Sequence, residues 1–396
     1  MSQTASIPVG IRAQTESAAI AGTSSVPWTI WCGVIGIISI VFGLYWDISW
    51  HQTIGRDTFW TPAHLALQFG GVMAAAVCTY LIFSTTFGDN ASARDASVRV
   101  WGFRGPLGAF LTAWGGVMMV TSAPFDNWWH NAFGLDVQIL SPPHVVLALG
   151  FLGVVLGILF LTVSEKNRAE GSARIMLDRL LLVAGGFMMV LALVMISEYT
   201  SPNQMHTARF YLLVSIFTPT ILLMLSSVSE RRWAATKIAA IYSALMLAGL
   251  WIFPLFPAQP RLGPVYTKVT HMVPMEFPLL IIAPAILIDL LRPRIAARSP
   301  WVRALILGPV FVIAMVIVQW PFANFMVSPA ARNYVFGMAN FPYPFPPSQY
   351  HFVWEFQPAE PTKSVFALWL FAALAVASLS SWLGIRRGEW LQRLRR

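Results

Sequence analysis

Residues 47–64 read DISWHQTIGRDTFWTPAH, and residues 126–144 read DNWWHNAFGLDVQILSPPH. Both stretches follow one order: an Asp, a His four residues later, a Gly four residues after that, a second Asp, and a Pro shortly before a final His. Each stretch lies between two long apolar runs. Because these residue types bind metals, the repeated order predicts a duplicated metal-binding unit where one helix ends and the next begins.

The composition places the chain in a membrane. It is 57% hydrophobic with only 11% charged residues, whereas a soluble domain carries about 25% charged residues. The net charge of +9 does not indicate nucleic-acid binding, because the basic residues follow the connecting loops instead of forming one patch. We therefore predict an integral membrane protein that contacts the lipid bilayer and has no nucleic-acid partner.

The apolar runs predict an all-α polytopic membrane bundle of about ten transmembrane helices. The predicted spans are 27–46, 62–84, 105–124, 143–163, 177–197, 208–228, 234–255, 272–291, 301–320 and 363–385. Most of the 26 lysines and arginines fall in the two tails and in alternate loops. Positive loops stay cytoplasmic, so both termini are predicted in the cytoplasm. Both motifs then face the periplasmic side of a bacterial inner or intracytoplasmic membrane.

Three regions are predicted along the chain. Residues 1–26 form a flexible cytoplasmic tail, residues 27–165 form a four-helix unit with both motifs, and residues 166–396 add six further helices. Within the last region, residues 321–361 are rich in proline and aromatic residues. Proline favours turns and extended backbone, so we expect this outer loop to be a structured cap and not another span.

Each motif supplies two imidazoles and a carboxylate. The candidate metal ligands are Asp47, His51 and His64 in the first motif and Asp126, His130 and His144 in the second. If the preceding helix continues through each motif, its Asp and first His share one helical face. The prolines suit the first turn of the next helix, which carries the final His. This donor set fits copper, and spacing alone does not exclude iron or zinc.

Weaker candidates surround these ligands. Asp57 and Asp136 could be additional ligands or could orient a ligating histidine, and Asp57 could instead pair with Arg56. A third, looser group lies around two other outer loops and does not share the motif spacing: Glu198, His206, Tyr266, His271 and Glu276.

The two motifs resemble the metal-binding stretches in the C subunit of the copper membrane monooxygenases, which oxidise methane, ammonia or short hydrocarbons. The residues that carry the resemblance are Trp50-His51-Gln52-Thr53, Arg56-Asp57-Thr58-Phe59 and Thr61-Pro62-Ala63-His64. One site of that family uses an Asp, a His four residues later and a His thirteen residues after that, as at Asp47, His51 and His64. A second site uses an Asn, a His four residues later and a His fourteen residues after that. Here an Asp replaces that Asn, giving Asp126, His130 and His144.

The resemblance covers residues 25–165 and implies a function. Copper at the motifs would support oxygen-dependent hydroxylation of ammonia or a small hydrocarbon, with a quinol as external reductant. The A and B subunits of such monooxygenases would be the partners. The C subunit of the family ends near the second motif, whereas this chain continues through residues 166–396.

Two other functions remain open from the residues alone. A copper acquisition or delivery protein would bind the metal without consuming oxygen. An ion-coupled or proton-coupled transporter would need ionisable residues along a path through the bilayer. Apart from Asp178 near the inner boundary, Asp289 at the inner end of the span 272–291, and Glu276, the middle of the predicted membrane region is nearly uncharged.

Overall fold

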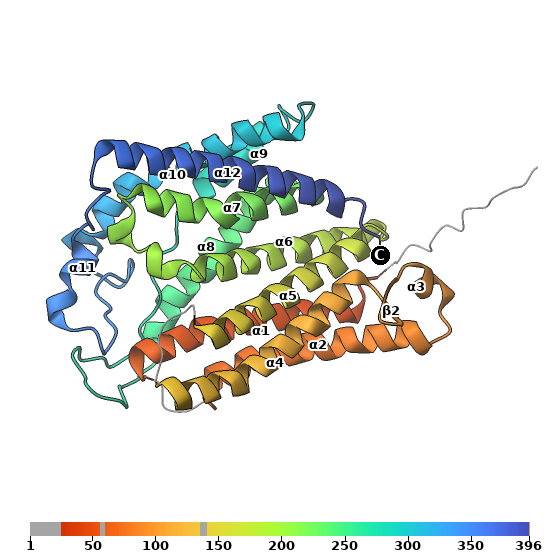
Figure 1. The fold of residues 1–396 in the computed structure, drawn as a ribbon, viewed down its shortest axis with the longest axis horizontal. Coiled ribbons are helices and arrows are strands. Elements are labelled where there is room, and N and C mark those ends of the chain that lie inside the picture. Colours follow the sequence, from red (N-terminus) through yellow and green to blue (C-terminus); the bar gives the residue numbers. More distant parts are fainter. Residues whose placement is uncertain (1–24, 56–59, 135–140, 396) are drawn as a thin grey trace, which may run out of the picture.

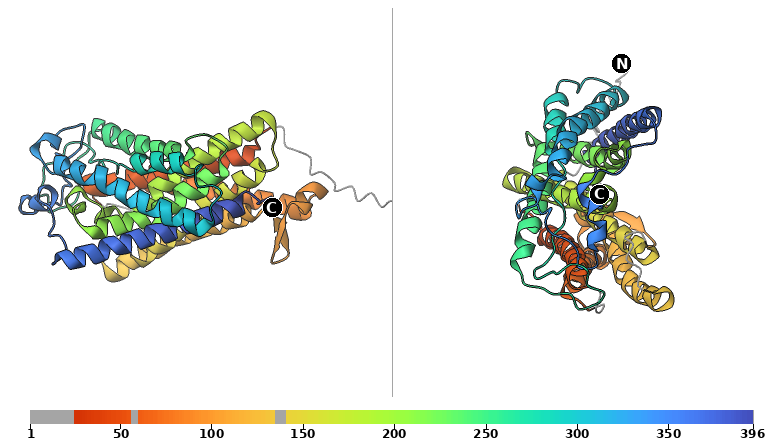
Figure 2. Two further views of the ribbon diagram at one scale, coloured as in Figure 1. Left: turned by 90° about the horizontal axis from the view of Figure 1, so that it is seen from above. Right: turned by 90° about the vertical axis from the view of Figure 1, so that its left-hand side faces the viewer.

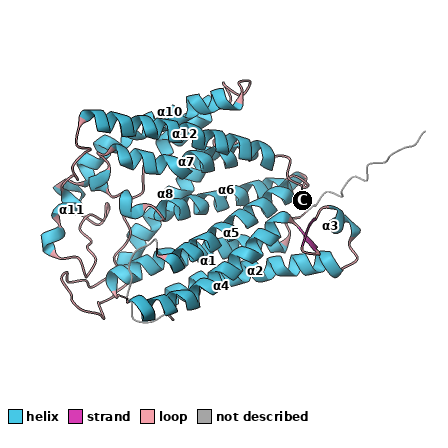
Figure 3. Cartoon of the chain, viewed as in Figure 1, coloured by secondary structure: helices cyan, strands magenta, loops and turns pink. Residues whose placement is uncertain are grey.

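The chain folds into a bundle of long helices (Figures 1 and 3). The computed structural model describes residues 25–55, 60–134 and 141–395. The helices are α1 (Trp28–Thr53), α2 (Pro62–Phe87), α3 (Ala91–Asp95), α4 (Leu107–Phe133), α5 (Pro142–Lys166), α6 (Gly171–Val194), α7 (Ala208–Val228), α8 (Ala234–Ile252), α9 (Ile282–Leu291), α10 (Pro300–Met326), α11 (His351–Trp354) and α12 (Lys363–Leu391). Among the described residues, nine helices are long and apolar enough to cross a membrane. The chain is therefore an integral membrane protein, and the predicted all-α polytopic fold is confirmed.

The long helices lie side by side along one axis of the molecule (Figures 1 and 2). The most extensive contacts join α7 to α12, α4 to α5, and α1 to α2. At the α4–α5 contact, a Cβ on Gly157 would lie 2.6 Å from the carbonyl oxygen of Gly108. Small residues let membrane helices approach this closely, so packing against the neighbouring backbone stabilises the pair.

The two ends of the bundle differ. Strands β1 (Val98–Val100) and β2 (Phe103–Gly105) form an antiparallel hairpin between α2 and α4. Trp101 and Gly102 make its two-residue turn with positive φ angles of 49° and 90°, as such turns require. Figure 1 shows this hairpin and the C-terminal end of α12 at one end of the bundle, while α1 and α4 both finish at the other end. Both motifs therefore lie at the end away from the hairpin.

One predicted span is only half helical. The sequence predicts a span over residues 272–291, but the helix α9 begins only at Ile282. Pro274 and Pro278 explain the difference, because proline has no N–H to donate and disfavours helical backbone in the residue before it. Pro284 is tolerated in the first turn of α9, where the N–H groups have no partner within the helix. We call residues 272–281 the extended segment.

The extended segment is held by buried side chains of three helices. On α1, the Ser49 hydroxyl donates to the Val273 carbonyl (2.6 Å), and the Thr53 hydroxyl accepts from the Val273 N–H (2.8 Å). Tyr242 on α8 and Gln319 on α10 accept two further backbone N–H groups of the segment. Because backbone polar groups must be satisfied inside a membrane protein, these side chains make the break in the helix possible.

The proline-rich and aromatic region begins later than the predicted residue 321, and we call residues 327–361 the cap. Helix α10 continues to Met326 with Pro321 inside it, and the cap that follows contains only short helices. Its Tyr343 N–H donates to the Gln52 carbonyl on α1 (3.0 Å). The cap is thereby attached to the helix end that carries the first motif. Residues 1–24 lie outside the described residues, and the predicted division at residue 166 stays a prediction.

Candidate metal centre and chamber

Local backbone structure brings the three ligands of the first motif together. Helix α1 continues through the motif, so Asp47 and His51 lie one turn apart on one face. Gly55 follows the helix with a φ of +90°, which a glycine adopts readily. The next helix, α2, starts with the Thr61 hydroxyl accepting from the His64 N–H (3.2 Å). This hydrogen bond at the start of the helix places His64 in the first turn of α2, beside the end of α1.

The resulting group has the geometry of a metal-binding triad. Oδ1 of Asp47 lies 3.0 Å from Nε2 of His64 and 3.5 Å from Nε2 of His51. The three ligand atoms all lie within 4.8 Å of one another. Oδ1 of Asp47 is buried and faces the Nε2 atoms of both histidines. A carboxylate oxygen facing two imidazoles in this way can serve as a ligand to one ion.

The second motif repeats this construction, although among the described residues only the first motif brings its three ligand atoms within 4.8 Å of one another. Helix α4 continues through Asp126 and His130, and Gly134 ends it with a φ of +88°. Oδ1 of Asp126 lies 3.2 Å from Nε2 of His130 and 3.6 Å from Nε2 of His144, which stands in the first turn of α5. Nδ1 of His130 lies 3.0 Å from the Gly134 carbonyl. Such a contact fixes the ring orientation and leaves Nε2 toward the carboxylate.

The structure therefore places each predicted triad around its own aspartate. The helix continuation, the first-turn prolines and the positions of both final histidines agree with the sequence prediction. Asp57 and Asp136, predicted as additional ligands or orienting groups, lie outside the described residues, as does Arg56, the predicted ion-pair partner of Asp57.

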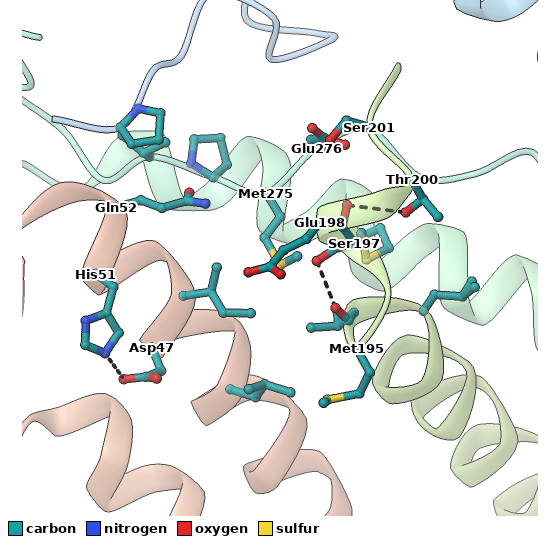
Figure 4. A pocket seen from close by; sticks show the side chains of 18 of the residues that line it. Asp47, His51, Gln52, Met195, Ser197, Glu198, Thr200, Ser201, Met275 and Glu276 are labelled. Carbon is teal, nitrogen blue, oxygen red and sulfur yellow. Dashed lines mark hydrogen bonds and ion pairs between the residues drawn. The ribbon is translucent and has the colours of Figure 1, made fainter. Parts of the chain in front are cut away.

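Both motifs border one chamber of about 760 Å³. Asp47, His51 and His64 line it from the first motif, and Asp126 and His144 line it from the second. The remaining walls come from the α6–α7 connection, from the extended segment and from the cap. Figure 4 shows His51 and Asp47 on one side of this space, with Glu198 and Met275 on the other. A molecule in this chamber could therefore reach residues of both motifs.

In the part of the chain that the structure describes, the looser third group does not assemble into a metal site. Glu198 and Glu276 line the chamber. In contrast, the His206 ring is stacked between Trp320 (4.2 Å between ring centroids) and Phe356 (3.7 Å). His271 is exposed, with its ring nitrogen 3.0 Å from the Thr270 hydroxyl. Nothing in the spacing of Glu198 and Glu276 in the sequence predicts that both line the chamber.

No known protein family, no curated protein and no solved structure matches this chain. A fold by itself does not define a function, so the function of this chain is argued from the site.

Proposed function

We propose that this chain is a copper-binding membrane protein that hydroxylates ammonia or a small hydrocarbon with molecular oxygen. The observation that carries the proposal is the triad of Asp47, His51 and His64, whose ligand atoms lie within 4.8 Å of one another at the wall of the chamber. The second triad, Asp126, His130 and His144, is proposed as a second copper site.

The donor set fits copper. Imidazole nitrogen is a good ligand for copper, iron and zinc, and a carboxylate completes a three-donor set that leaves positions open for other ligands. The buried Oδ1 of Asp47 faces both imidazoles, so that one ion between the three side chains could bind all of them. When bound, copper supplies one-electron and oxygen chemistry. The resemblance to the C subunit of the membrane monooxygenases favours copper over iron and zinc.

The chain's own residues would bind and position a small substrate. Apolar side chains form much of the chamber wall near the first triad: Leu44, Ile48, Leu67, Leu147 and Phe151. Such a wall admits an apolar molecule and limits the water beside it. Asp47 holds both histidines on one side of this space, so a substrate in the chamber lies next to the triad.

The proposal also includes a membrane location and partner subunits. The motif end would face the periplasm of a bacterial inner or intracytoplasmic membrane, since the basic loops favour the cytoplasm. Partners resembling the A and B subunits of the membrane monooxygenases would complete the enzyme.

Oxygen consumption tests this function. Copper-loaded membranes that contain the chain with its native partners, supplied with a quinol, should consume oxygen when ammonia or a short alkane is added. His64→Ala should abolish this consumption, whereas His271→Ala, the same change at an exposed histidine outside the chamber, should retain it. Copper binding without any substrate-dependent consumption would instead support a copper acquisition or delivery protein.

One observation favours a second candidate function, a membrane carrier for cations. The extended segment breaks a membrane-spanning stretch and lines the chamber, and broken helices of this kind form ion and substrate sites in transporters. Uptake of radioactive copper by proteoliposomes would distinguish this function, because a hydroxylase that does not transport shows no uptake above empty vesicles.

A further inference from the structure

The chamber wall opposite the first triad carries two carboxylates. Glu198 comes from the α6–α7 connection and Glu276 from the extended segment. Figure 4 shows the Glu198 side chain pointing from its loop toward α1, with Glu276 beside Ser201. The Ser201 hydroxyl hydrogen-bonds Glu276. These two carboxylates belong to neither triad.

Apart from the histidines of the two triads, the described charged side chains that line the chamber are all carboxylates. Within the described parts of the chain, the lining residues include no lysine or arginine. They include four carboxylates: Asp47, Asp126, Glu198 and Glu276. In a cavity with apolar walls, charges of one sign act through a low dielectric and concentrate ions of the opposite sign. The side of the chamber that carries Glu198 and Glu276 therefore favours a cation, while the apolar wall near the first triad remains suited to a neutral molecule.

Aromatic rings lie next to these carboxylates. Phe277 directly follows Glu276, and its ring lies 5.3 Å from that of Phe336, which also lines the chamber. Further aromatic residues also line the chamber: Tyr242, Phe341 and Phe345. Ring faces attract organic cations, whereas hard metal cations take a shell of oxygen ligands. A mixture of carboxylates and aromatic rings therefore fits an organic ammonium ion best.

The extended segment gives a second, independent indication of a ligand site. Non-helical backbone at membrane depth persists where it lines a cavity, and here it brings Glu276 to the chamber wall. Buried side chains fix the segment at Val273 and at Leu279. Glu276 lies between these two fixed points, so the protein holds this carboxylate in a defined place.

We propose that the chamber binds a small organic ammonium ion, with its charged nitrogen at Glu198 and Glu276 and its apolar group against Phe277 and Phe336. The chamber volume of about 760 Å³ lies within the range of small-molecule sites. This binding does not depend on copper, so it stands or falls separately from the proposed hydroxylase activity.

Calorimetric titration with benzylammonium tests the proposal. The full chain is reconstituted in lipid nanodiscs and freed of metal with a chelator, so that a failure of the metal sites does not affect the result. Benzylammonium should bind saturably, and the neutral benzyl alcohol and the anionic benzoate should bind at least about tenfold more weakly. Equal binding of benzylammonium and benzyl alcohol would overturn the proposal, as would no binding of benzylammonium.

Two variants locate the site, and one serves as a control. Glu276→Gln keeps the shape of the side chain and removes its charge, and should weaken benzylammonium binding by about tenfold or more. Glu198→Gln changes a side chain that is exposed to the chamber, so its effect can be read even if Glu276→Gln fails to fold. Asp89→Asn makes the matched change at an exposed residue beyond the end of α2. Equal weakening in all three variants, or none in either glutamate variant, would overturn the proposed site.

Discussion

Thr53→Val should destabilise the protein mainly because it leaves one buried backbone N–H without an acceptor. The buried Thr53 hydroxyl donates to the Ser49 carbonyl (2.6 Å) within α1 and also accepts from the Val273 N–H (2.8 Å) of the extended segment. Valine has a similar shape but leaves that N–H without an acceptor. A buried donor without a partner costs about 1–3 kcal/mol, and this is the loss expected in the free energy of unfolding.

Thr162→Val is the matched control. Thr162 on α5 is also fully buried, and its hydroxyl donates to the Ile158 carbonyl of its own helix (2.7 Å). Removing this within-helix hydrogen bond leaves no other polar group without a partner. The change should therefore lower the free energy of unfolding by no more than about 0.5 kcal/mol. Both variants are measured by reversible unfolding in mixed micelles, followed by circular dichroism. If their free energies of unfolding agree within about 0.5 kcal/mol, the extended segment does not depend on Thr53 and the reasoning is refuted.

Three further changes test other parts of the structure. Lys166→Met should cost about 3–5 kcal/mol of unfolding free energy, because it leaves the buried Asp178, 3.0 Å from the lysine, without its main partner. In the same unfolding assay, the double variant Lys166→Met/Asp178→Leu should recover most of this loss. Additive losses in the double variant would contradict the pairing. Gly157→Ala should cost about 1–3 kcal/mol, because its Cβ would stand 2.6 Å from the Gly108 carbonyl oxygen; an unchanged unfolding midpoint would show that α4 and α5 can separate freely. Gly134 has a φ of +88° in the turn after His130, so Gly134→Ala should strain this turn by about 1–3 kcal/mol. Competition titration should then show weaker copper binding at the second triad and no change at the first.

The sequence predicted the two triads because local rules govern them. Asp47 and His51 are four residues apart, so a continuing helix places them on one face whatever the tertiary structure. Pro62 begins the next helix for an equally local reason, since the first turn does not need its N–H. Only the short loop then separates this pair from His64, and the close approach of the three side chains follows from consecutive elements of the chain.

The chamber could not be predicted in the same way. Glu198 and Glu276 reach it from distant parts of the sequence, and their positions depend on how α6, the extended segment and the cap pack together. No residue spacing records that arrangement. The metal is likewise not fixed by the sequence, because imidazole and carboxylate donors serve copper, iron and zinc alike.

The break in the predicted span at 272–291 did have a signal in the sequence. Hydropathy counts apolar side chains and is insensitive to a missing backbone donor, so it predicts a continuous span there. Pro274 and Pro278, four residues apart, remove two N–H groups and disfavour helix before each of them. The partners that stabilise the break, Ser49 and Thr53, lie more than two hundred residues away on α1. The break was therefore visible in the sequence, but its stabilisation was not.

Copper stoichiometry tests the central claim most directly. The purified chain is loaded with copper, freed of weakly bound ions and analysed for metal content beside His64→Ala, His144→Ala and the control His271→Ala. The two triads predict about two copper ions per chain in the wild type and the control, and about one in each triad variant, since each retains one complete donor set. Full copper content in both triad variants, or no copper in the wild type, would contradict the assignment of the two triads as metal sites.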